Sequence, residues 1–198
     1  MLTQLSTVKA RLGIDEFDLS SDAILTNAIN AISARFDKVT NRTLARTTTA
    51  TQEFSADDAE ICLASYPVES VSKFELKQNE TEGWIEQTGV EYLIRRACVI
   101  SLAQPLSDSR STLNAPQARV TFSGGYVLPG ATVGTGQTAL PSDLEQAAVE
   151  QVASWFQNRD KLGLTRIWFH QGTYEQFSQL DLLLNVQAVL KRYERWVI

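Results

Sequence analysis

The first forty residues of the chain carry apolar side chains at helical spacing. They predict a short helix that ends at Gly13, because glycine readily adopts the left-handed conformation that closes a helix. A longer helix is predicted to begin at Ser20 or Ser21, either of which could cap it, and to stop near Asn41. The apolar positions on these two helices are Leu5, Val8, Leu12, Leu25, Ala28, Ile29, Ile32, Phe36 and Val39.

The last sixty residues show the same helical spacing. A third helix is predicted from Ser142, where Ser142 and Glu145 have the spacing of a capping box, and Gly163 could close its end. After a loop over residues 164–177, a fourth helix is predicted over about 178–196. The apolar faces of these two helices are formed by Leu144, Ala148, Val152, Phe156, Leu182, Val186, Val189, Leu190, Tyr193 and Val197.

Between these helical ends, residues 44–126 contain short alternating or β-branched segments separated by turn residues, which favours an antiparallel sheet or small sandwich. The predicted strands are 47–54, 61–63, 73–77, 84–86, 92–94, 99–102 and 119–123. Residues 127–139 are rich in glycine and uncharged, which is typical of a linker.

The pattern therefore predicts an α+β protein. Its main part is a helical bundle built from both chain ends, residues 1–43 and 140–198. The β module 44–126 is inserted between them, and the linker 127–139 leads back to the bundle.

Composition narrows the function classes. The 198 residues are 43% hydrophobic and 21% charged, as in an ordinary folded protein, and no stretch approaches the roughly 20 apolar residues of a membrane span. The N-terminal residues lack the features of a signal peptide. The net charge of −5 argues against a conventional DNA-binding protein. Cys62 and Cys98 are too few for a disulfide scaffold and are expected to be reduced.

Catalytic and cofactor motifs are weak. His170 is the only histidine, so neither a His-rich zinc site nor a Ser-His-Asp triad is expected, and the acidic residues Asp57, Asp58 and Glu60 are typical of a solvated turn. Gly134–Ala139 matches a dinucleotide fingerprint in letters only, because Leu140-Pro141 separates it from the helix. We expect no metal, no cofactor and no enzymatic activity. The alternative is a small nucleotide-binding enzyme that uses residues 130–139.

Two clusters of basic and aromatic residues suggest contact with a partner. The first, at the C-terminus, contains Lys191, Arg192, Tyr193, Arg195, Trp196 and Ile198. Trp and Arg are common interface anchors, although basic residues at a helix end also complement its dipole. The second, Arg166, Trp168 and Phe169 beside His170, lies in a short predicted loop. These residues could either cap the bundle or meet a neighbouring subunit.

Several short segments, in this order, resemble the head–tail connector (adaptor) proteins of tailed bacteriophages. They are Val8-Lys9 with Leu12-Gly13-Ile14, Thr40-Asn41-Arg42-Thr43-Leu44, Tyr66-Pro67-Val68, Thr121–Tyr126, Leu140–Leu144, Asn158-Arg159 and Arg192-Tyr193. The chain departs from that family at Asn185, where relatives often have a proline, and over residues 168–176, which match none of its segments.

The resemblance implies a structural virion protein in the neck at the portal vertex, assembled in the host cytoplasm. Such proteins form a ring of about twelve copies beneath the portal protein, closed by a head-to-tail interface. The ring extends the channel through which packaged DNA passes, and it docks a stopper or tail terminator protein. In this reading the C-terminal tail, residues 191–198, contacts the portal and the β module faces neighbours or the tail side. A tail-completion or neck protein at another level of the channel is the alternative.

Overall fold

A computed structural model describes residues 1–107, 116–161, 166–168, 174–176 and 182–195, with the backbone only for 161, 166–168 and 174–176. The chain divides into two compact units. The helical unit contains Met1–Thr40 and Leu140–Glu194. The β unit contains Asn41–Ala139 and, from the C-terminal end, Arg195. Helices and antiparallel sheets together confirm the α+β class.

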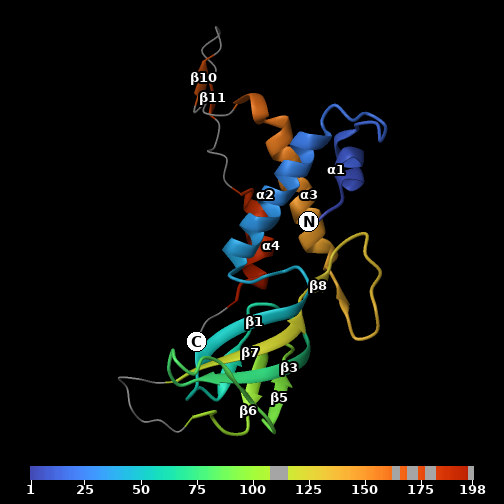
Figure 1. Cartoon of the computed structure of the whole chain (residues 1–198). Helices are drawn as coiled ribbons and strands as arrows, with labels where there is room; N and C mark the ends of the chain where they lie inside the picture. Colours follow the sequence, from blue (N-terminus) through green and yellow to red (C-terminus); the bar gives the residue numbers. More distant parts are fainter. Residues whose placement is uncertain (108–115, 162–165, 169–173, 177–181, 196–198) are drawn as a thin grey trace. The chain divides into compact units, whose positions relative to one another are not determined.

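In the helical unit, α3 packs against the other three helices (Figure 1). The helices are α1 (Leu5–Leu12), α2 (Asp22–Thr40), α3 (Ser142–Gln157) and α4 (Leu184–Tyr193), and a short 3-10 turn, η1 (Arg159–Lys161), follows α3. Gly13 has a φ of 69° at the end of α1, as predicted. The predicted apolar positions that are buried are Val8, Leu25, Ile29, Ile32, Phe36, Leu144, Ala148, Val152, Leu182, Val186 and Leu190.

Three predictions for the helices are wrong in detail. Val39 is 44% exposed, and Thr40 takes its place in the core because its hydroxyl donates to the Phe36 carbonyl oxygen at 2.8 Å. The capping box does not form, since Pro141 precedes α3 and its carbonyl oxygen accepts from the first-turn amides of Leu144 and Glu145. The fourth helix begins at Leu184 rather than near 178.

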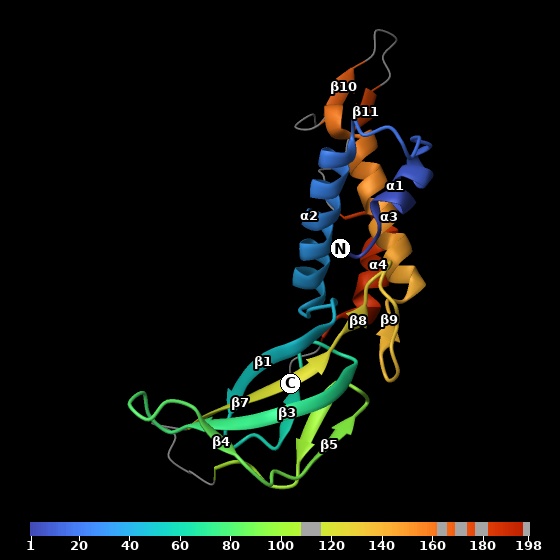
Figure 2. The ribbon, with the colours of Figure 1, turned by 45° about the vertical axis from the view of Figure 1, so that its right-hand side comes forward.

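The β unit contains two antiparallel sheets (Figure 2). The larger has the order β1-β7-β3-β4, formed by Thr47–Ser55, Gln117–Gly124, Val68–Lys77 and Ile85–Gln87. The smaller has the order β2-β6-β5, formed by Glu60–Cys62, Val99–Leu102 and Tyr92–Arg95. Their side chains share one core of Ile61, Leu63, Val68, Phe74, Ile100, Leu102, Val120 and Phe122. Every strand expected in this region is present: the strand at 99–102 has the predicted bounds, and the ends of the others differ from the prediction by at most five residues.

The segment predicted as a linker has paired ends. β8 (Tyr126–Val127) and β9 (Thr138–Ala139) form a two-stranded parallel pair. Tyr126 and Val127 are buried. Residues 128–137 are therefore a closed loop on the β unit, because the pairing joins the two ends of the segment that was expected to be an open link.

Residues from three of the segments that carry the family resemblance meet around Arg42. This guanidinium is buried, lies 3.3 Å from the ring centroid of Tyr66 and 5.2 Å from that of Tyr126, and donates to the Tyr66 carbonyl oxygen. The peptide bond from Tyr66 to Pro67 is cis. A Cβ on Gly124 would lie 2.8 Å from the Ser65 carbonyl oxygen, so only glycine fits there. These segments therefore build the inside of the β unit.

Residues 164–177 were expected to form a loop, and that prediction is wrong. β10 (Arg166–Trp168) and β11 (Tyr174–Gln176) pair as antiparallel strands, with Arg166 opposite Gln176 and Trp168 opposite Tyr174. Bulky apolar and aromatic residues favour extended backbone, which is consistent with the pairing of these two short strands.

Candidate functional site

The last turn of α4 separates into an outer and an inner part. Lys191 and Arg192 are exposed. Tyr193 is half-buried, and its hydroxyl donates to Asp143 Oδ1, in the first turn of α3, at 2.7 Å. Of the three, Lys191 and Arg192 are available to a partner, whereas Tyr193 fixes the end of α4 within the helical unit.

Polar contacts also fix the start of α4. The Leu183 amide donates to Oε1 of Gln151, a fully buried side chain on α3, at 2.8 Å. Asn185 donates to the carboxylate of Glu150, one residue earlier on α3. Because both ends of α4 are hydrogen-bonded to α3, its outer face is held in a defined position.

A pocket lies between α2 and α4, which we call the α2–α4 pocket. It has a volume of about 380 Å³ and is lined by Arg35, Val39, Leu182, Gln187, Leu190, Lys191 and Glu194. Among the lining residues, Leu182 and Leu190 are buried, Val39 is 44% exposed, and Arg35, Lys191 and Glu194 are charged. Lys191 is thus the predicted partner residue that lines this mixed pocket of apolar and charged side chains.

Arg195 belongs to the β unit and contacts it directly. Its Nη2 donates to the Cys62 carbonyl oxygen, at the end of β2, at 3.0 Å. Within the described residues, its Nε is buried and has no hydrogen-bond partner. Arg195 also lines a pocket of about 480 Å³ between Phe54 of β1 and Ile61 of β2. Within the C-terminal tail, Arg195 therefore lies against the β unit of its own chain.

Five of the predicted partner residues cannot be placed as side chains. Trp196, Ile198 and Phe169 lie outside the described residues, as does His170. Arg166 and Trp168 lie on β10, of which the backbone alone is described.

The glycine-rich loop, which the nucleotide-binding alternative would use, is closed by the side chain of Gln137. The Gly134 backbone amide donates to the side-chain oxygen Oε1 of Gln137 at 2.9 Å, and the backbone amide of Gln137 donates to the Gly134 carbonyl oxygen. A phosphate loop needs such amides to point at the ligand. The loop is also followed by β9 and Pro141 before α3 begins. This geometry argues against a dinucleotide fingerprint at residues 134–139.

Neither a metal-binding cluster nor a membrane-spanning helix occurs in the described part of the chain. In these residues, no group of three or more His, Cys, Asp or Glu side chains could hold a metal ion. In the same residues, no helix has the length and apolar character needed to cross a membrane. Asp57, from the acidic turn, accepts a hydrogen bond from the Ser55 hydroxyl.

Sequence reasoning missed the loop between α1 and α2, residues 13–21. Phe17 is 88% exposed and Leu19 is 72% exposed, the two most exposed large apolar side chains of the described residues apart from Leu184. They interrupt a run of acidic residues, Asp15, Glu16 and Asp18. Apolar residues that fit neither neighbouring helical stripe were the signal that could have found them.

Comparisons with known proteins give structural matches only. No protein-family model matches the chain, and no curated protein matches it. A chain from the neck of an empty gene transfer agent (GTA) particle with C6 symmetry matches with a TM-score of 0.57 and 14% identity. A chain from the native GTA virion matches with a TM-score of 0.55 and 17% identity. Each match covers 98% of this chain and 89% of the other.

A third match comes from the neck of the native GTA particle with C12 symmetry, with a TM-score of 0.50 and 16% identity over 96% of this chain and 89% of that one. At these identities the likeness establishes a shared fold. The chain therefore shares the fold of these gene transfer agent chains along almost its whole length.

Proposed function

We propose that the protein is a non-enzymatic adaptor of a phage-like particle, which forms a ring between the portal and the tail. The observation that carries the proposal is the fold shared with neck chains over 98% of this chain. The connector-like segments, in their order along the sequence, support the same proposal independently. In the proposal, the helices of both chain ends form the bundle of the ring subunit, and residues 44–126 are the inserted β module.

Physical arguments support a ring on a DNA channel. A head-to-tail interface repeated about an axis closes into a ring, so each subunit needs two different adhesive surfaces. The net charge of −5 suits a channel through which DNA must pass, because basic walls would retain phosphates. The neck structures that share the fold have C6 and C12 symmetry, which is consistent with closed rings of six or twelve.

The C-terminal tail is the proposed portal contact. Within this tail, residues 191–198, Arg195 is the first residue that belongs to the β unit, where it donates a hydrogen bond to the Cys62 carbonyl oxygen. Trp196 and Ile198 follow it and supply an aromatic and an apolar anchor of the type found at interface centres. The β module is proposed to face neighbouring subunits or a stopper or tail terminator protein.

Truncation after Glu194 tests the portal contact, because it removes residues 195–198 of the tail and leaves α4 with its Tyr193–Asp143 bond intact. We expect the truncated chain to be missing from portal-bearing heads. We also expect these heads to remain without tails. Arg195→Ala is the matched control, since it removes the bond to Cys62 but keeps residues 196–198. Retention of the truncated chain on heads at the full-length level would refute the portal contact.

The alternative is a tail-completion or neck protein at another level of the channel, since the matched structures are necks as a whole. Direct binding to purified portal distinguishes the two. An adaptor binds portal alone, whereas a protein from a lower level binds only when the adaptor is already present.

A further inference from the structure

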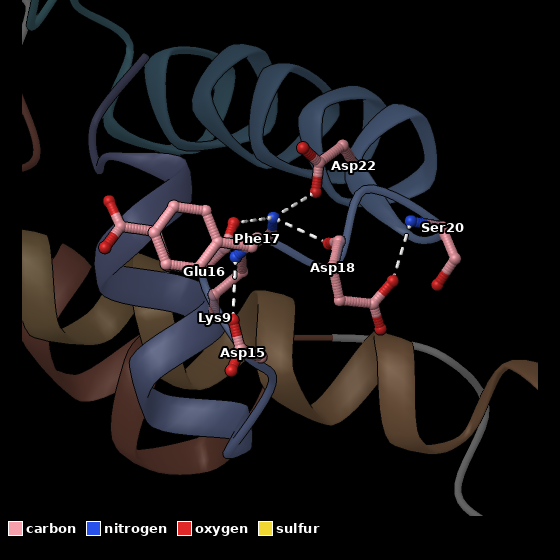
Figure 3. A network of polar contacts seen from close by, with 7 residues as sticks. All are labelled: Lys9, Asp15, Glu16, Phe17, Asp18, Ser20 and Asp22. Carbon is pink, nitrogen blue, oxygen red and sulfur yellow. Dashed lines mark hydrogen bonds and ion pairs between the residues drawn. The ribbon is translucent and has the colours of Figure 1, made fainter.

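The α1–α2 loop is held by a buried lysine. Lys9 of α1 is 3% exposed, and its Nζ donates to the carbonyl oxygens of Glu16 at 3.0 Å and Asp18 at 2.8 Å (Figure 3). The same ammonium lies 2.5 Å from Asp22 Oδ1, at the start of α2. One cation therefore ties the loop to both helices.

Two local turns fix the rest of the loop. The Phe17 amide donates to Asp15 Oδ1 at 2.8 Å, and the Ser20 amide donates to Asp18 Oδ1 at 2.9 Å (Figure 3). The loop thus has a set conformation, and this conformation leaves Phe17 and Leu19 in solvent. A fixed loop with two exposed large apolar side chains has the form of an interface anchor.

The α2–α4 pocket offers a complementary surface. Its lining includes buried apolar side chains, and its volume of about 380 Å³ falls within the range of roughly 300–1,000 Å³ for sites that take small molecules, so an aromatic side chain fits. Arg35 and Lys191 on its wall oppose in sign the exposed Asp15, Glu16 and Asp18 of the loop. Glu194 is the single acidic residue among the lining residues.

The loop cannot fill the pocket of its own chain. It ends at the first residue of α2, Asp22, whereas the pocket lies at Arg35 and Val39, near the other end of the helix. At 1.5 Å per residue, Asp22 and Val39 are about 25 Å apart along the axis. The two surfaces are therefore separate patches on one helical unit.

We propose that the α1–α2 loop of one subunit inserts Phe17 and Leu19 into the α2–α4 pocket of the next copy of this chain. This inference rests on the proposed adaptor function and names the partner of its Lys191 surface as the neighbouring subunit. Two different patches make the contact heterologous, the type that closes into a ring by repetition. The acidic loop and the basic wall fix its direction, because loop against loop would bring like charges together.

Cysteine cross-linking on portal-bearing heads tests the contact. In a chain whose native Cys62 and Cys98 are replaced by alanine, the pair Leu19→Cys and Val39→Cys is treated with a short bis-maleimide reagent. Both positions are exposed, so neither change should disturb folding. We expect a ladder of cross-linked species that rises to the full ring.

Single-cysteine variants are the matched controls. Leu19→Cys alone and Val39→Cys alone should give monomers, and an equal mixture of the two should give dimers and nothing larger. Phe17→Ser with Leu19→Ser should weaken subunit association roughly ten- to a hundredfold, with the unfolding curve of the free chain unchanged.

Two results would overturn the interface while leaving the adaptor function intact. One is a complete ring on heads without the ladder, and the other is self-cross-linking of Leu19→Cys. Absence of the unaltered chain from purified heads and particles is a different result. It would overturn the adaptor function, and this interface with it.

Discussion

Replacing Lys9 by methionine should destabilise the helical unit by about 3 kcal/mol. Methionine keeps most of the unbranched stem and its packing but removes the ammonium. The change leaves the Glu16 and Asp18 carbonyl oxygens without their donor and Asp22 Oδ1 without its counter-charge. That oxygen is buried and accepts no hydrogen bond from the described residues.

The magnitude follows from opposing effects. Each hydrogen bond from a charged donor contributes about 1.5–3 kcal/mol, and breaking one partner of a buried ion pair costs about 3–5 kcal/mol. Folding of the methionine variant does not require an ammonium to be removed from water, and the absence of this cost offsets several kcal/mol of the loss. Asp22 is 27% exposed, so water can reach part of its carboxylate. The net effect is thus at the lower end of that range.

Urea unfolding followed by far-UV circular dichroism, which reports mainly the helices, measures the change. Lys38→Met on the exposed side of α2 is the matched control and should change the free energy of unfolding by less than about 0.5 kcal/mol. A loss below about 1 kcal/mol for Lys9→Met would show that the loop does not depend on this ammonium. It would also remove the main support for the inference that the loop holds Phe17 in place before subunits associate.

Gly125→Ala should lower the free energy of unfolding by at least about 3 kcal/mol in chemical unfolding, because its φ is 102° and a Cβ would lie 2.6 Å from the Ala45 carbonyl oxygen. Gly83→Ala is the control and should lower it by only about 1–2 kcal/mol, since its φ is 70° but a Cβ would meet open space. Burial raises the pKa of Glu75, but hydrogen bonds from Lys73 and Arg119 outweigh it and hold the pKa below its usual value. Its contribution to stability is therefore present above the unfolded-state pKa and lost as the pH falls through the folded-state pKa, and Glu75→Gln should remove this loss from the acid-unfolding profile. Burial raises the pKa of the Cys98 thiol, so at pH 8 maleimide should label it more slowly in the folded protein than in urea.

The helices were predictable because their apolar positions follow the helical period. The predicted apolar face was wrong at one position, where a polar residue is buried in place of an apolar one. In the sequence, Val39 continues the apolar spacing of α2. Thr40 is buried instead, because its hydroxyl is satisfied by the Phe36 carbonyl oxygen. A β-branched polar residue at a helix end can thus compete with valine for the core. That exchange leaves Val39 in the α2–α4 pocket.

The α1–α2 loop shows what local pattern cannot supply. Lys9 sits beside Val8 on a short amphipathic helix, where a lysine is expected to face water. It is buried because loop carbonyl oxygens and a carboxylate from another helix surround its Nζ. These partners converge only after the loop closes. The sequence showed Phe17 and Leu19 as apolar residues among carboxylates, but not that they would be held in solvent.

Both halves of the proposed ring contact are set before subunits meet. The ammonium of Lys9 fixes the loop, and α4, which carries the pocket wall, is tied to α3 through Tyr193 and Gln151. Ordering flexible loops on association costs roughly 0.5–1.5 kcal/mol for each immobilised side chain. Surfaces that are already ordered in the free subunit largely avoid this cost. In a closed ring, the effect is repeated at every interface. In the proposed ring, the buried lysine therefore links the stability of one helical unit to the assembly of the whole ring.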